Sequence, residues 1–93
     1  MATITGVQGE LLTTGTTAET AIVISDAPSQ EGPVMFMIEV ISGSVKFGIG
    51  SIASGAYANP AASKRIYTCL PNQLRCKQAS SGDTFVITCA RDL

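Results

Sequence analysis

The sequence predicts an all-β protein, a small antiparallel β-sandwich or barrel of six to seven short strands. Apolar and polar residues alternate with a period of two in several short stretches, which is typical of half-buried strands. Gly, Pro, Asn and Ser residues separate these stretches at spacings of roughly 8–15 residues, and no long helical pattern is present. With 93 residues, the chain is expected to form a single domain over residues 1–93.

The clearest stretch is Val34–Ile49, which reads VMFMIEVISGSVKFGI and predicts a β-hairpin. We take Ser42 and Gly43 as its two loop residues, with Gly43 supplying the positive φ that such a turn needs. This register places three apolar pairs on one face, namely Val40 with Val45, Ile38 with Phe47 and Phe36 with Ile49. On the other face Glu39 lies opposite Lys46, which predicts a cross-strand ion pair.

Before this hairpin we expect two strands and two connections. One short edge strand lies near Ala2–Val7 or Glu10–Thr14, and a Thr-rich connector follows it. The β-branched stretch Thr20–Ser25 predicts a strand that ends at Asp26-Ala27-Pro28. The segment Ser29–Pro33 is expected to be a loop closed by Gly32-Pro33.

Residues 51–64 allow two structures. Asn59 followed by Pro60 could begin a one-turn helix, with Asn59 as the N-cap and Pro60 at the first helical position. The alternative is an extended surface loop, because Ser54-Gly55 and Asn59-Pro60 are also turn signals.

The segments Arg65–Leu70 and Leu74–Ala79 predict a second hairpin around Pro71-Asn72-Gln73. Its register directs one set of residues to one face, namely Ile66, Thr68, Leu70, Leu74 and Cys76. The opposite face then carries Arg65, Tyr67, Cys69, Arg75 and Lys77. The last strand is Thr84–Ala90, with Phe85, Ile87 and Cys89 pointing inward, and residues 91–93 form a polar tail.

Composition indicates a surface that a partner covers in part. Hydrophobic residues make up 45% of the chain and charged residues only 14%, which is a sparse charge for an isolated small domain. The net charge is −1, but the residues before Lys46 carry −5 and the rest carry +4. Either the two halves meet inside one domain, or copies dock acidic edge to basic face, or one face meets an oppositely charged partner.

The residues that catalysis and metal binding use most often are scarce. The chain has no histidine and no nucleophile-elbow or phosphate-loop motif, and Gly48-Ile49-Gly50 is too short for a dinucleotide fingerprint. Cys69, Cys76 and Cys89 lack the paired spacing and the fourth ligand of a zinc site, so Cys76 and Cys89 are interpreted as buried thiols. We therefore expect no enzyme activity, no cofactor and no metal.

Two groups of residues are candidates for an interface. Arg65, Tyr67, Arg75 and Lys77 share one predicted sheet face, which is either a cationic docking surface for an acidic partner or an ordinary solvated face. Met35 and Met37 lie on the outer face of the first hairpin, where a second layer or a partner is expected to cover them. Nucleic acid is not an expected partner, because the chain has no net basic charge, no Trp and two Tyr.

Neither a secretory signal nor a membrane span is expected. The sequence MATITGVQGE has no basic region and no apolar core. The longest uninterrupted apolar run, Val34–Ile38, is far too short to cross a bilayer.

Residues 41–50 (ISGSVKFGIG) and 74–88 (LRCKQASSGDTFVIT) together resemble small β-sandwich structural proteins of tailed-phage particles. The shared features are a Ser-Gly-x-Val-x-Phe-Gly strand, a strand with Lys and Ala after its hydrophobic positions, and a Ser-Gly-Asp-Thr turn before a final strand. The resemblance implies a non-enzymatic virion protein, assembled in the host cytoplasm, that decorates or cements a capsid or forms a head-fibre base. Its implied partners are the major capsid protein or other virion proteins, and further copies of itself, for example as trimers. The alternative is a ligand-binding module of the tail-fibre or adhesin type.

Overall fold

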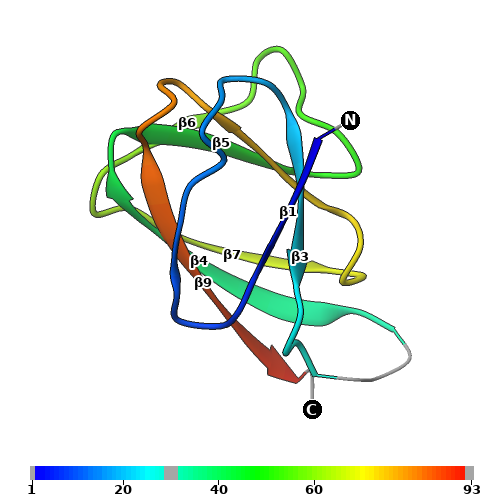
Figure 1. The fold of residues 1–93 in the computed structure, drawn as a ribbon. Helices are drawn as coiled ribbons and strands as arrows, with labels where there is room; N and C mark the ends of the chain where they lie inside the picture. Colours follow the sequence, from blue (N-terminus) through cyan, green and yellow to red (C-terminus); the bar gives the residue numbers. More distant parts are fainter. Residues whose placement is uncertain (1, 29–31, 92–93) are drawn as a thin grey trace.

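The computed structural model describes residues 2–28 and 32–91 as an all-β sandwich-like fold (Figure 1). Residues 29–31 of the expected loop and residues 92–93 of the expected tail lie outside the described residues. The described part contains nine strands: β1 (Ala2–Gly6), β2 (Leu11–Leu12), β3 (Thr20–Ile24), β4 (Val34–Ser42), β5 (Ser44–Ile49), β6 (Ala58–Pro60), β7 (Lys64–Cys69), β8 (Leu74–Gln78) and β9 (Thr84–Arg91). The prediction of an all-β fold is confirmed.

The strands form two sheets that enclose one apolar core. Sheet A has the order β1-β3-β8-β5-β6 and sheet B the order β2-β9-β4-β7. All neighbouring strands are antiparallel except β1 and β3, which run parallel. The sequence allowed an edge strand at residues 2–7 or at 10–14, and both form, one in each sheet.

Aromatic and branched side chains from alternate strand positions fill the space between the sheets. Phe47 of sheet A meets Phe85 of sheet B edge to face, with ring centroids 5.6 Å apart. Such a contact contributes about 0.5–1.5 kcal/mol beyond the burial of apolar area. The core consists of Leu12, Ile22, Ile24, Val34, Phe36, Ile38, Val40, Val45, Phe47, Cys69, Leu74, Cys76, Phe85 and Ile87.

The predicted hairpin over residues 34–49 is wrong, because its two strands lie in different sheets. β4 pairs with β7 and β9, whereas β5 pairs with β6 and β8. Glu39 and Lys46 therefore do not face each other across a strand pair. Val40 and Val45 are both buried as expected, but they enter the core from opposite sides. Ile49, expected to be buried, is 47% exposed at the end of β5.

Gly43 makes this change of sheet possible. Its φ of +78° lies in the left-handed region, where an L side chain is strained. A Cβ atom at this position would also overlap the carboxylate of Asp83. That carboxylate is buried and accepts hydrogen bonds from the backbone N–H of Ser44 (3.3 Å) and Ser80 (2.9 Å). Asp83 thus holds the β4–β5 connection against the β8–β9 connection.

The second predicted hairpin is also wrong, since β7 belongs to sheet B and β8 to sheet A. On β8 the inward positions are Leu74 and Cys76, as predicted. On β7 the predicted faces are reversed, because pairing with β4 and not with β8 sets the orientation of this strand. Ile66 is 64% exposed, whereas Cys69 is buried.

The segment 51–64 contains no helix, and Asn59 is not an N-cap. Residues 58–60 form strand β6, whose partner is β5. The Asn59 side chain points into the protein, where its Nδ2 donates a 3.0 Å hydrogen bond to the Val45 carbonyl. Pro60 is compatible with this short strand because β6 is the edge strand of sheet A among the described strands, so the missing backbone N–H of proline breaks no sheet hydrogen bond on its outer side.

Candidate functional site

The six residues predicted to form an interface do not share one surface. Met35 and Met37 lie on the outer face of sheet B, and Arg75 and Lys77 lie on the outer face of sheet A. Arg65 and Tyr67 belong to β7, at positions of that strand that alternate toward the core. The expected cluster of Arg65, Tyr67, Arg75 and Lys77 on one face is therefore wrong, because the two strands that carry it lie in different sheets.

Tyr67 and Arg65 have structural contacts inside the protein. The Tyr67 ring packs against Phe47 with 6.1 Å between centroids. Burial raises the pKa of the Tyr67 hydroxyl, and the charge of Arg65 lowers it by a smaller amount. Arg65 donates a 2.7 Å hydrogen bond from Nε to Asn59 Oδ1, and its guanidinium lies 5.2 Å from the centroid of the Tyr57 ring. Arg65 thus links the edge strand of sheet B to the edge strand of sheet A.

The outer face of sheet B carries several exposed apolar side chains. Met37 lies between Thr88 and Ile66 in one row across the sheet. The next row runs from Leu11 through Val86 and Glu39 to Lys64. Met37 is 45% exposed, Ile66 64% and Leu11 58%. We call Met35, Met37, Ile66, Val86 and Leu11 the apolar face.

A shallow groove crosses the apolar face. It has a volume of about 240 Å³, and its lining includes Met37, Glu39, Lys64, Ile66 and Val86. Glu39 and Lys64 are register partners, and the lining also includes Arg65 and Thr88, so charged and polar groups border the apolar residues of the groove. This arrangement suits adhesion to a surface with matching apolar and polar groups.

Sequence reasoning found only part of the apolar face. It placed Met35 and Met37 correctly on an outer surface, but it assigned Ile66 to the core and did not single out Leu11 or Val86. The pairing of β4 with β7 and β9 joins these residues, which are far apart in the sequence. No local sequence pattern predicts that pairing.

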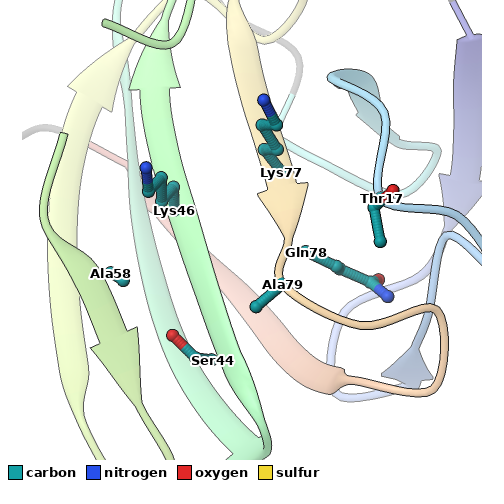
Figure 2. A pocket seen from close by; sticks show the side chains of 7 residues that line it. All are labelled: Thr17, Ser44, Lys46, Ala58, Lys77, Gln78 and Ala79. Atoms are coloured by element: carbon teal, nitrogen blue, oxygen red, sulfur yellow. The ribbon is translucent and has the colours of Figure 1, made fainter. Parts of the chain in front are cut away.

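The outer face of sheet A carries a second depression, of about 370 Å³, which contains two lysines (Figure 2). Lys46 of β5 and Lys77 of β8 extend from neighbouring strands in the same direction, and the loop residue Thr17 lies across from Lys77. The remaining lining residues are Ser44, Ala58, Gln78 and Ala79. We call this the lysine depression. Sequence reasoning missed it because Lys46 had been assigned to an ion pair with Glu39.

The three cysteines are free thiols, and their burial indicates a structural role. Cys69 and Cys76 are buried, Cys89 is partly buried, and no disulfide joins them. Cys69 was expected on an outer face and is instead in the core, for the same reason that the other β7 residues are reversed. Burial raises the pKa of the Cys76 thiol to about 12, so this thiol stays protonated near neutral pH. Among the described residues, no group of three or more Cys, Asp and Glu side chains is placed to hold a metal ion.

Comparison with protein-family models, with curated proteins and with solved structures finds no match to this chain. Within the described ranges, no helix is long and apolar enough to span a lipid bilayer.

Proposed function

We propose that this protein acts by adhesion, as a non-enzymatic virion structural protein that decorates or cements a phage capsid. The observation that supports this proposal is the apolar face, a sheet surface on which Met37, Ile66 and Leu11 are each about half exposed. A small domain that leaves such residues uncovered is typical of one that binds a larger surface. The resemblance of residues 41–50 and 74–88 to phage structural proteins supports the choice of a capsid as that surface.

The expected binding energy of one subunit is small. Complete burial of a Met, Ile or Leu side chain contributes about 1.5–3 kcal/mol, so covering the exposed half of three such side chains contributes roughly 3 kcal/mol. This is too little for tight binding of a single copy once the entropy of association is subtracted. A repeating lattice compensates, because linked copies bind with avidity and a subunit that binds only the assembled shell stabilises it by mass action.

We also propose that the subunits form homo-oligomers. Among the described strands, β7 is an edge of sheet B and pairs with β4 alone, so its other side offers backbone groups to a second chain. A trimer is one form that the resemblance to phage structural proteins implies. Light scattering of the purified chain tests this, and a single monomeric species at micromolar concentration would contradict it.

The experiment for adhesion is co-sedimentation of the purified chain with mature capsids. Binding in a stoichiometry that matches the capsid lattice is expected for the wild type. Met37→Asp and Ile66→Asp should remove binding, because each places a charge in the centre of the contact. Val23→Asp is the matched control, since Val23 is an exposed apolar residue, 38% accessible, on the outer face of sheet A. Equal binding by all three variants would refute the assignment of the apolar face.

The lysine depression favours one second candidate, a ligand-binding module of the tail-fibre or adhesin type. A pocket of about 370 Å³ with charged and hydroxyl groups is within the size range of small-molecule sites. This candidate predicts that the purified chain binds a small ligand without any capsid present. Failure to bind mature particles, together with binding of a ligand, would favour it over the capsid proposal.

A further inference from the structure

We propose that the lysine depression is a binding site for a tetrahedral oxyanion, of the phosphate or sulfate monoester class. It lies on the outer face of sheet A, away from the apolar face of sheet B, so it does not depend on the proposed adhesion. The groups that would bind the anion are the ammonium groups of Lys46 and Lys77 and the hydroxyl groups of Thr17 and Ser44.

The two lysines repel each other in the absence of a ligand. Lys46 and Lys77 are direct cross-strand partners in the antiparallel β5–β8 pair, and like charges in this position destabilise a sheet. In the described part of the chain, neither ammonium forms a hydrogen bond or an ion pair. A bound anion between them would turn this repulsion into attraction.

Arg75 adds to the positive charge of this face. It lies two residues from Lys77 on β8 and opposite Gly48. Its Nη1 donates hydrogen bonds to the carbonyl oxygens of Asn72 (2.8 Å) and Leu74 (3.1 Å), while its Nε is buried and has no partner among the described residues. Arg75 is thus fixed in place by backbone groups and not by a carboxylate.

No carboxylate of the described residues forms an ion pair with Lys46 or Lys77, although Asp83 accepts a hydrogen bond from the backbone N–H of Ser44, which lines the depression. Glu10, Glu19, Asp26 and Asp83 each accept a hydrogen bond from a backbone N–H, of Val7, Ile52, Gln8 and Ser80 respectively. Glu39 lies on the outer face of sheet B. The charges of Lys46 and Lys77 are therefore not neutralised by an acid of the described chain.

The chemistry of the depression favours a tetrahedral oxyanion over a carboxylate. Lysine ammonium groups act as compact point charges with three donors each, which suits the oxygens of phosphate and sulfate. The volume of about 370 Å³ exceeds that of a bare ion, and the methyl groups of Ala58 and Ala79 offer an apolar wall. The site thus has room for the organic part of an ester.

The test is a titration of the whole chain with inorganic phosphate, a sugar phosphate, a sugar sulfate and acetate, followed by amide NMR shifts. We expect saturable shifts of the amide signals of residues 44–46 and 77–79 with at least one of the three phosphate or sulfate compounds. Acetate should bind more weakly. Each of Lys46→Gln and Lys77→Gln should weaken binding by about 10–100-fold, as expected for loss of a charge-assisted contact.

Lys64→Gln is the matched control, because Lys64 is a lysine of the outer face of sheet B. The affinity of the Lys64→Gln variant for the anion should stay within about twofold of the wild-type affinity. Loss of one charge-assisted contact would instead weaken binding by about tenfold. Equal losses for Lys46→Gln, Lys77→Gln and Lys64→Gln, or no saturation by any anion at millimolar concentration, would refute the site. Lys46→Gln and Lys77→Gln should retain capsid binding, because neither residue lines the groove of the apolar face, so failure of this site and failure of the adhesion proposal are distinguishable.

Discussion

Gly43 and Gly50 provide a direct test of the change of sheet between β4 and β5. Both glycines have a φ of +78°, so an alanine at either position is strained by about 1–2 kcal/mol. Their surroundings differ. A Cβ at Gly50 meets nothing within 4 Å, whereas a Cβ at Gly43 overlaps the Asp83 carboxylate.

The Gly43→Ala substitution should therefore cost much more than Gly50→Ala. Displacement of Asp83 weakens its hydrogen bonds to the backbone N–H groups of Ser44 and Ser80, each contributing about 1–1.5 kcal/mol. With the backbone strain, Gly43→Ala is expected to lower the free energy of unfolding by about 3–5 kcal/mol and Gly50→Ala by about 1–2 kcal/mol. A chain of 93 residues has a total stability of about 5–14 kcal/mol, so both variants can be measured.

The assay is denaturant unfolding of both variants and of a double-mutant cycle with Asp83→Ala. In the Asp83→Ala background, Gly43→Ala should cost only about 1–2 kcal/mol, because the carboxylate that it would displace is gone. If β4 and β5 instead formed a hairpin with a solvent-exposed turn, the two glycine variants would cost the same. Equal costs within about 0.5 kcal/mol would refute the sheet-to-sheet connection.

Two further predictions concern buried polar groups and a buried thiol. Asn59→Ala should lower the free energy of unfolding by about 2–4 kcal/mol, because it removes the hydrogen bond to the Val45 carbonyl and the one from Arg65 Nε. Asn72→Ala, at an exposed position, is the control. Equal losses of stability for the two variants in denaturant unfolding would contradict the prediction. Burial raises the pKa of Cys76 from its ordinary value of 9.0 to about 12, so its contribution to stability is complete below pH 9 and is lost as the pH rises toward 12. Between pH 9 and pH 12 the free energy of unfolding should therefore decrease with pH faster in the wild type than in Cys76→Ala, by up to about 1.4 kcal/mol per pH unit. Parallel pH profiles of the two proteins would exclude this effect.

The two outer faces of the sandwich have different chemistry, which separates the two proposals. The apolar face of sheet B combines half-exposed Met37 and Ile66 with a groove whose lining includes Glu39, Lys64 and Arg65. The lysine depression of sheet A combines two uncompensated ammonium groups with two hydroxyls. A protein that attaches by the first face would present the second to the solvent, where a ligand can reach it.

The sequence by itself determined the class of the fold and most of the core. Period-two alternation in residues 34–40 places Val34, Phe36, Ile38 and Val40 on one face of a strand, and all four are buried. The strand at Thr20–Ile24 was also recognisable from its β-branched residues. These features depend only on neighbours along the chain.

Tertiary structure alone decided which strands pair, and therefore where the surface residues lie. Val40 and Val45 are buried equally well whether the chain folds back within one sheet at Ser42–Ser44 or crosses there to the other sheet. The alternation of apolar and polar residues therefore cannot distinguish a hairpin from a sheet-to-sheet connection. Crossing places Lys46 beside Lys77 and Met37 beside Ile66. Both candidate sites arise from contacts between distant segments, because sheet pairing is set by how the whole core closes and not by local preference.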